Sequence, residues 1–315
     1  MRVAVVGAGA IGGFVAAALA RAGAEVGVVA RGAHLDAIAK HGIEIVDSDL
    51  GPFNARVTAV DDVRKLGAID VALLTFKAHQ WPLLLPQLRG LARSRTPIVP
   101  LQNGVPFWFA RTPPLQTVDP GARVGATFPN AFVLGAVVHV SGHVARPGVI
   151  HQSGGLRYWL GELDGSNSPR LDGLIAQFQA AGLDAGFDAN IRETMWLKLV
   201  NNSGLNPVSA LSGLTIGRML ENPSTLSEVR ALMFEAIAVG QALGAIIDAN
   251  VDERIARASR LTDVKTSMLQ DLEANRPLEL DPILGALVEL GDRKRVPVPH
   301  LRTAYEALCA RSGME

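Results

Sequence analysis

Three polar side chains recur at every fourth position in a segment of the second half of the chain that is rich in apolar residues. Lys198, Asn202 and Asn206 share one face of a predicted helix, because four residues make little more than one helical turn. One cation and two amides in a line could hold a carboxylate and a carbonyl oxygen. A solvated helix face is the alternative, but asparagine is a poor helix former, so two of them among apolar residues favour a functional site.

Glycines near the N-terminus follow the pattern G-x-G-x-x-G. The pattern comes directly after a predicted strand, Val3–Val6, and opens a predicted helix, Ala10–Arg21. In such a loop the first glycine allows a tight turn, the second lets the backbone approach a pyrophosphate, and the third permits close helix–strand packing. With 32 glycines in the chain, a structural turn without a ligand is the alternative. The predicted dinucleotide loop consists of Gly7, Ala8, Gly9, Ala10, Ile11 and Gly12.

The end of the second predicted strand, Glu25–Ala30, distinguishes between cofactors. Sites for NAD usually place Asp or Glu there, where the carboxylate accepts hydrogen bonds from the ribose hydroxyls. This chain has Arg31 instead, and a guanidinium suits the 2′-phosphate of NADP by charge and by bidentate geometry. NADPH is therefore the predicted cofactor, and a solvated surface arginine is the alternative.

Polar residues also follow two later predicted strands. Lys77 comes after the strand Asp70–Thr75, and Asn103 comes after Pro97–Leu101. Ligands of open α/β sheets bind beyond the carboxyl ends of the strands, so both positions suit a cofactor site. Taken singly, each could equally be a solvated or turn residue. The seven histidines show no metal-ligand spacing, so no metal is predicted.

The order of the predicted elements divides the chain in two. Alternating strands and helices in the first half predict a parallel sheet covered by helices, and strands between Thr127 and Leu160 predict an antiparallel extension of that sheet. From Ile191 onward the pattern is helical. We therefore predict an α/β fold with a Rossmann-type NADP-binding domain over residues 1–189 and an all-helical substrate and catalytic domain over residues 190–315.

Composition restricts the partners and the compartment. Thirty basic and thirty acidic residues give a formal net charge of zero, which argues against nucleic acid or an acidic membrane as a partner. The single cysteine, Cys309, forms no internal disulfide and fits a reducing compartment. Neither a signal peptide nor a membrane span is predicted, so we expect a cytoplasmic protein whose helical domain could supply a homodimer interface.

These residues together resemble the ketopantoate reductase (2-dehydropantoate 2-reductase) family over nearly the whole chain. The order and spacing of the set are far more specific than the glycine loop alone. The resemblance is carried by Gly7–Gly12, Arg31, Thr75-Phe76-Lys77-Ala78, Gln102-Asn103-Gly104, Asn190-Ile191-Arg192, Trp196-x-Lys198-Leu199, Asn202-x-x-x-Asn206-Pro207, Ser267-Met268-Leu269-Gln270-Asp271 and Glu279-Leu280-Asp281.

The resemblance implies an active site between a Rossmann domain and a helical domain. It also implies hydride transfer from NADPH to ketopantoate, giving pantoate for pantothenate and coenzyme A synthesis, with Lys198 as the proton donor to the substrate carbonyl oxygen. Glu279 would assist the lysine or sit near the nicotinamide ribose. The other implied contacts are Asn103, Asn202, Asn206 and Ser267 with the substrate, Asn103 also with the nicotinamide, Arg31 and Lys77 with the NADP end, and Ala131 beside the cofactor.

The sequence departs from the family pattern in one respect. A further substrate-contacting asparagine of some members has no counterpart here, since the stretch Leu211–Gly217 offers only Ser212 and Thr215. The family also contains paralogues with other substrates. The prediction is thus an NADPH-dependent reductase of a small 2-keto acid, with ketopantoate as the specific substrate. The alternatives are a reductase or dehydrogenase of another small hydroxy acid and a non-catalytic NADPH sensor.

Overall fold

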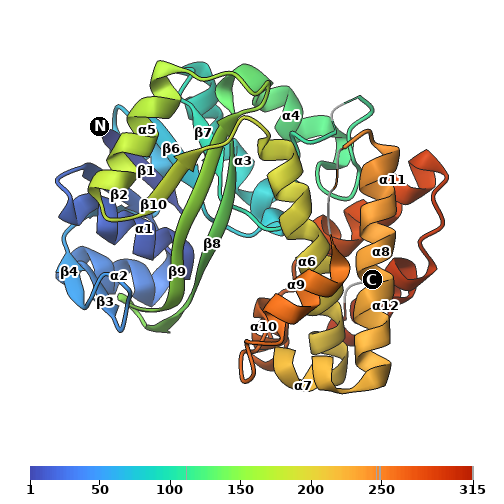
Figure 1. Cartoon of the computed structure of the whole chain (residues 1–315). Helices are drawn as coiled ribbons and strands as arrows, with labels where there is room; N and C mark the ends of the chain where they lie inside the picture. The colour runs from blue at the N-terminus through green and yellow to red at the C-terminus, as the bar shows by residue number, and fades with distance from the viewer. Residues whose placement is uncertain (111, 246, 248–249, 314–315) are drawn as a thin grey trace. The chain divides into compact units, whose positions relative to one another are not determined.

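The computed structural model describes residues 1–110, 112–245, 247 and 250–313, and it divides into two compact units (Figure 1). The first unit consists of Met1–Gln102 and Arg123–Arg192, and the second of Asn103–Ala122 and Glu193–Glu315. Within the described residues, no helix is both long and apolar enough to cross a bilayer.

A five-stranded parallel sheet in the first unit has the strand order β5-β2-β1-β6-β7. The interior strand β6 is buried along its whole length, as expected for a parallel strand covered on both faces. Because all strands point the same way, their carboxyl ends share one edge of the sheet. The strands are β1 (Arg2–Val6), β2 (Glu25–Val29), β5 (Thr58–Val60), β6 (Val71–Leu74) and β7 (Ile98–Pro100).

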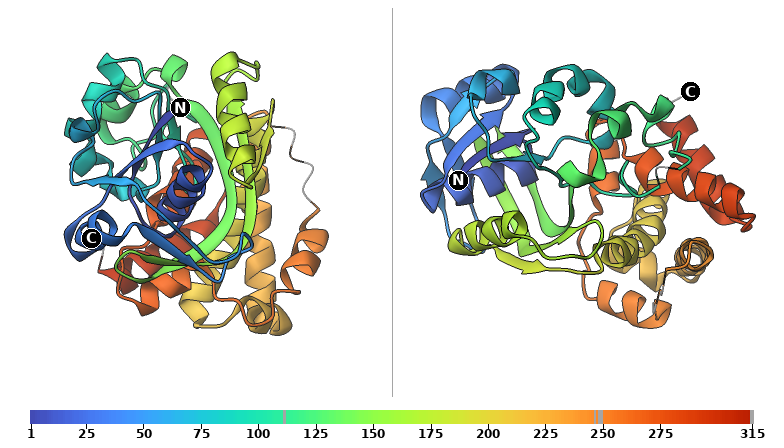
Figure 2. Two further views of the ribbon diagram at one scale, coloured as in Figure 1. Left: turned by 90° about the vertical axis from the view of Figure 1, so that its left-hand side faces the viewer. Right: turned by 90° about the horizontal axis from the view of Figure 1, so that it is seen from above.

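The helix that follows the glycine loop, α1 (Ala10–Arg21), is buried from Gly12 to Leu19. A helix that is apolar on every side needs cover on every side. The parallel sheet packs on one face of α1, and a long curved hairpin covers the opposite face (Figure 2). The other helices of this unit are α2 (Gly32–His41), α3 (Trp81–Arg93), α4 (Arg123–Thr127) and α5 (Pro169–Ala180), with 3-10 turns η1 (Val63–Leu66), η2 (Ala78–Gln80) and η4 (Asn130–Phe132). The 3-10 turn η3 (Pro120–Ala122) belongs to the second unit.

The strands after Thr127 correct the predicted extension of the parallel sheet. They form a second sheet, in which the antiparallel hairpin β8–β9 is joined by three shorter strands in the order β10-β9-β3-β4. The physical reason is α1, whose second apolar face this sheet covers. The strand Ile43–Val46, although it lies early in the sequence, also belongs to this second sheet. Its strands are β3 (Ile43–Val46), β4 (Phe53–Ala55), β8 (Leu134–Arg146), β9 (Val149–Glu162) and β10 (Asp184–Phe187).

The second unit is built mainly of helices, as predicted. Its first helix, α6 (Ile191–Ser212), carries all three polar residues that were predicted to share one helix face, and it continues through Pro207. Buried side chains on both sides of that proline, Ser203 and Ala210 among them, keep the helix packed. The helices that follow are α7 (Ile216–Glu221), α8 (Pro223–Ala242), α9 (Val251–Ala258), α10 (Ser267–Glu273), a π-helical turn η5 (Asp281–Gly285), α11 (Ala286–Lys294) and α12 (Pro299–Ser312).

The segment from Asn103 to Ala122 corrects the prediction of one continuous domain over residues 1–189. The backbone N–H of Val105 donates to the Pro282 carbonyl at 2.7 Å, and those of Gln116 and Thr117 each donate to the Glu289 carboxylate at 2.9 Å. These bonds attach the segment to the second unit, although strands of the first unit flank it in the sequence. The boundary predicted after residue 189 differs little from the last crossing, between Arg192 and Glu193.

Candidate active site

The glycine loop lies at the carboxyl end of β1, where it turns into α1. Gly7 has φ +104°, a conformation that suits glycine, and its N–H and that of Ala8 both donate to the Val29 carbonyl at 3.1 and 3.2 Å. A Cβ on Gly12 would stand 2.1 Å from the Gly7 oxygen and 2.3 Å from Thr75 Oγ1. The third glycine is therefore required by close packing of the helix against the loop and strand.

Gly9 differs from the other two glycines, because a Cβ there would meet nothing within 4 Å. It is exposed and is the N-cap of α1, where no side chain of the described residues forms a capping hydrogen bond. No acidic residue occupies the first turn of α1 either. The helix N-terminus thus offers N–H donors and a positive dipole end to an approaching anion.

Two cations follow the strands on either side of β1. Arg31 is exposed and is the N-cap of α2, which follows β2, while Lys77 is partly buried and precedes η2, which follows β6. Both β2 and β6 pair with β1 in parallel, so both cations follow carboxyl ends that flank the glycine loop. Their charges suit a phosphorylated ligand at this edge. Ala131 lies in η4, and its carbonyl accepts a hydrogen bond from Arg170 at 2.5 Å.

In the second unit, three predicted residues form one hydrogen-bonded chain. Lys198 Nζ donates to Asn103 Oδ1 at 2.9 Å, and Asn103 Nδ2 donates to Glu279 Oε2 at 3.1 Å. The orientation of the amide follows from its partners, because an ammonium can only donate and an ionised carboxylate can only accept. Residues separated by 95 and 176 positions in the sequence thus meet through one amide group.

Burial and the charge of Glu279 shift the pKa of Lys198 in opposite directions. Removal from water lowers the pKa of Lys198 from its usual value near 10.5 to about 8, and the negative charge of Glu279 opposes that shift. An amine with a pKa of about 8 exchanges protons readily near neutral pH. Such a group can act as a general acid toward a developing alkoxide.

Neighbouring contacts hold the two segments that carry Asn103 and Glu279 together. The residue after Asn103, Gly104, has φ +81°, and a Cβ there would lie 2.3 Å from the Pro282 carbonyl oxygen. Pro282 belongs to the π-helical turn that begins two residues after Glu279, and the Tyr305 hydroxyl donates to Asp281 at 2.6 Å in the same turn. The amide and the carboxylate are therefore carried on segments in direct backbone contact.

The remaining predicted substrate contacts lie on two helices of the second unit. Asn202 is partly buried and Asn206 is buried, on the same face of α6 as Lys198. Ser267 is exposed at the first position of α10, whose N-cap Thr266 accepts a hydrogen bond from the Leu269 N–H. Their contact with a substrate stays a prediction.

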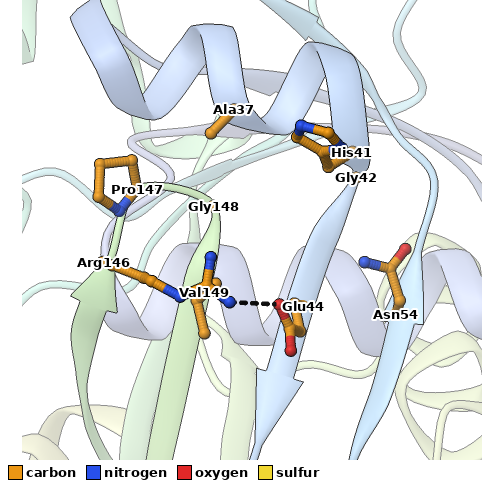
Figure 3. A pocket seen from close by; sticks show the side chains of 9 residues that line it. All are labelled: Ala37, His41, Gly42, Glu44, Asn54, Arg146, Pro147, Gly148 and Val149. Carbon is orange, nitrogen blue, oxygen red and sulfur yellow. Dashed lines mark hydrogen bonds and ion pairs between the residues drawn. The ribbon is translucent and has the colours of Figure 1, made fainter.

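A hollow of about 370 Å³ in the first unit contains none of the predicted residues (Figure 3). An ion pair of 3.1 Å between Glu44 and Arg146 lines it, and it lies at the amino ends of β3 and β9. It is therefore distinct from the carboxyl edge that bears the glycine loop. Its lining residues are Ala37, His41, Gly42, Glu44, Asn54, Arg146, Pro147, Gly148 and Val149.

Comparison with known proteins identifies the family of this chain. The family model described as "Ketopantoate reductase PanE/ApbA" matches residues 3–165, which is more than half of the chain. The chain belongs to the ketopantoate reductase family. A second model, "Ketopantoate reductase PanE/ApbA C terminal", matches residues 190–312. By membership of this family the chain is an oxidoreductase.

Individual relatives match this chain over its whole length. A 2-dehydropantoate 2-reductase of Mesorhizobium japonicum is 38% identical over 100% of this chain and 98% of its own. A crystal structure from Ralstonia solanacearum MolK2, described as a candidate ketopantoate reductase, has a TM-score of 0.92 at 36% identity over 99% of this chain and 98% of its own. A D-mandelate dehydrogenase in complex with NADH and anilino(oxo)acetate shares the fold, with a TM-score of 0.85 at 21% identity over 99% of this chain and 98% of its own.

Several residues around the glycine loop had no predicted role. Thr75 Oγ1 donates to the Gly7 carbonyl at 2.6 Å, and Gln102 Nε2 donates to the Phe76 carbonyl at 2.8 Å. His34 contacts the carbonyl of Ala8. Each of these side chains bonds to backbone atoms of a remote segment, and no spacing in the sequence signals such a contact.

Proposed function

We propose that the chain uses NADPH to reduce a small 2-keto acid, specifically 2-dehydropantoate (ketopantoate) to pantoate for pantothenate and coenzyme A synthesis. The observation that carries the proposal is the hydrogen-bonded chain from Lys198 through Asn103 to Glu279. Its support is the family, in which the relative of Mesorhizobium japonicum is named 2-dehydropantoate 2-reductase. A cytoplasmic location and a homodimer stay predictions of the sequence.

The proposed catalytic role of the second unit is proton donation by Lys198, supported by the charge of Glu279. NADPH, when bound, supplies a hydride for the keto carbon of the substrate. Lys198 donates a proton to the carbonyl oxygen as negative charge develops there, so the keto group gains the two hydrogens of a secondary alcohol. Asn103 fixes the position of the ammonium, and Glu279 favours its protonated state before the reaction. Asn202, Asn206 and Ser267 are the proposed contacts to the rest of the acid.

The first unit carries the proposed cofactor site. The open backbone at Gly9 and the uncapped N-terminus of α1 fit a diphosphate, because both present N–H groups without a side chain in the way. Arg31 is the proposed partner of the 2′-phosphate, which is why NADPH rather than NADH is proposed. Lys77 adds a second positive charge at the same edge, and Ala131 is the proposed neighbour of the cofactor.

A substrate and cofactor screen tests the proposal. Purified protein is mixed with NADPH or NADH and a panel of 2-keto acids, and oxidation of the cofactor is followed by absorbance. We expect ketopantoate with NADPH to give the highest kcat/KM. A preference for another acid, such as the keto acid corresponding to mandelate, would show that the enzyme is a reductase or dehydrogenase of a different small hydroxy acid. Tight NADPH binding without oxidation by any acid would favour a sensor.

A further inference from the structure

His34 is a partly buried residue in the first turn of α2, three positions after Arg31. Its ring joins two backbone segments that are far apart in the sequence. Nε2 lies 2.6 Å from the Ala8 carbonyl oxygen, and Nδ1 lies 3.0 Å from the backbone nitrogen of Gly148. The first contact is within the glycine loop, and the second is at the turn between β8 and β9.

The two partners fix the state of the ring. The Gly148 N–H can only donate, so Nδ1 must present a lone pair to it. A neutral imidazole then carries its proton on Nε2, which donates to the Ala8 carbonyl. His34 thus acts as a donor to the loop and as an acceptor for the hairpin turn, which Figure 3 shows beside α2.

The bond to Ala8 determines where the next N–H points. The Ala8 carbonyl and the Gly9 N–H belong to one planar trans peptide group, so they point in opposite directions. With the carbonyl directed at His34, the Gly9 N–H points to the opposite side of the peptide group from the His34 ring. Space is open at Gly9, since a Cβ there would meet no atom within 4 Å. That space is where the proposed diphosphate would lie.

Glycine makes this anchor necessary. Because Gly9 tolerates backbone conformations that other residues rarely adopt, the Ala8–Gly9 peptide could flip if its carbonyl were released. A flipped peptide would turn a carbonyl oxygen, instead of an N–H, toward a diphosphate. The flanking N–H groups of Gly7 and Ala8 are held by Val29, but those bonds leave the orientation of the Ala8 carbonyl open.

We propose that His34 is a positioning residue for the cofactor, which holds the Ala8 carbonyl so that the Gly9 N–H faces the diphosphate of the dinucleotide. This inference rests on the proposed function, since it assumes that NADPH is the dinucleotide. It assigns to His34 no contact with NADPH itself. Its effect should therefore be on cofactor affinity, with the rate at saturating NADPH unchanged.

Two nearly isosteric substitutions separate the two contacts of His34. In His34→Gln an amide nitrogen takes the approximate place of Nε2, so the bond to the Ala8 carbonyl is kept and that to Gly148 is lost. In His34→Asn an amide oxygen takes the approximate place of Nδ1, so the reverse holds. The variant His34→Ala loses both. Loss of one hydrogen bond in this setting is expected to weaken binding by about tenfold.

The experiment measures the Kd of NADPH by titration calorimetry for the wild type and the three variants, with Tm as the check on folding. We expect His34→Asn and His34→Ala to bind NADPH about tenfold more weakly, and His34→Gln to stay within about twofold of the wild type. The kcat at saturating NADPH and the KM of the keto acid should not change. Adenosine 2′-monophosphate, which lacks the diphosphate, should bind all four proteins alike.

Two other outcomes would overturn the inference. If His34→Asn bound NADPH with wild-type affinity, the contact with Ala8 would be unimportant for binding. If the Gln and Asn variants lost affinity and Tm in parallel, His34 would have a structural role only. A wild type that binds no NADPH would instead defeat the proposed function, and the inference with it. The two kinds of failure are thus distinguished by the wild-type titration alone.

Discussion

The glycine loop of the first unit and the hydrogen-bonded chain Lys198–Asn103–Glu279 of the second unit use different chemical groups. The loop presents backbone N–H groups, and its shape depends on where side chains are absent, at Gly9 and Gly12. The Lys198 chain presents charged and amide side chains, and its properties depend on burial and on Glu279. Substitutions in the loop should therefore change its packing and weaken the binding of the cofactor. Substitutions in the hydrogen-bonded chain of Lys198 should instead change the charge at the site and lower kcat.

The largest effect is expected from removal of the proton donor. In Lys198→Met the ammonium is replaced by an apolar side chain of similar length, so kcat should fall by about a thousandfold or more. The Kd of NADPH should stay within about twofold, because the loop is untouched. Since a buried ammonium is costly, the Tm should not fall. A variant with wild-type turnover on its preferred keto acid would contradict the role of Lys198.

Two glycine substitutions should distinguish the part of the loop that is needed for packing, at Gly12, from the part that is open to a ligand, at Gly9. In Gly12→Ala the new Cβ collides with the Gly7 carbonyl, so both the Tm and NADPH affinity should fall, with a cost to folding of about 1–3 kcal/mol. In Gly9→Ala the Cβ meets no protein atom, so the Tm should be kept while affinity falls about tenfold or more. Thermal unfolding and NADPH titration measure both. Unchanged affinity in Gly9→Ala would remove the case for a diphosphate there.

A smaller effect is expected on the preference for NADPH over NADH when Arg31, at the carboxyl edge of the parallel sheet, is replaced. Arg31→Ala should lower the preference for NADPH over NADH, expressed as a ratio of kcat/KM, by about tenfold to a hundredfold, because a charged hydrogen-bond partner of the 2′-phosphate is lost. Lys40→Ala, an exposed position later on α2, is the matched control and should leave the ratio unchanged. An unaltered ratio in Arg31→Ala would make that side chain a solvated surface residue.

The smallest expected effect is a shift in a pH profile. Reduction requires the protonated form of Lys198, so kcat should decline as pH rises through about 8. In Glu279→Gln the charge that opposes the lowered pKa is removed, so the decline should begin at lower pH. At acid pH, where the lysine is protonated in both proteins, the difference should narrow. A profile that moved to higher pH, or did not move, would show that Glu279 does not act on Lys198 in this way.

Features set by local patterns could be predicted from the sequence. The glycine spacing after Val3–Val6 located the loop, and the four-residue spacing of Lys198, Asn202 and Asn206 located one face of α6. The first pattern is a strand–turn–helix motif and the second reflects the period of one helix, so residues close in the sequence are enough to reveal both. The match to the family then depended on many such segments in a fixed order.

Features set by contacts between remote segments could not be predicted in the same way. The strand Ile43–Val46 has the same appearance whether it extends the first sheet or joins the second, because its pattern shows only that alternate residues are buried. The transfer of 103–122 to the second unit depends on bonds to Pro282 and Glu289. His34 bonds to main-chain atoms, which every residue possesses and which therefore leave no pattern to detect.

The position of α1 between two sheets has a consequence for how a cofactor would be received. A Cβ on Gly12 would strike Thr75 on one side of the helix, and a Cβ on Gly13 would lie 2.0 Å from the Ile150 side chain on the other. A loop mounted on so confined a helix is preorganised, and little conformational entropy is lost when a ligand occupies it. The backbone amides of α1 beyond its open first turn, from Gly13 to Arg21, should accordingly be among the last to exchange with solvent deuterium, whether or not a dinucleotide is present.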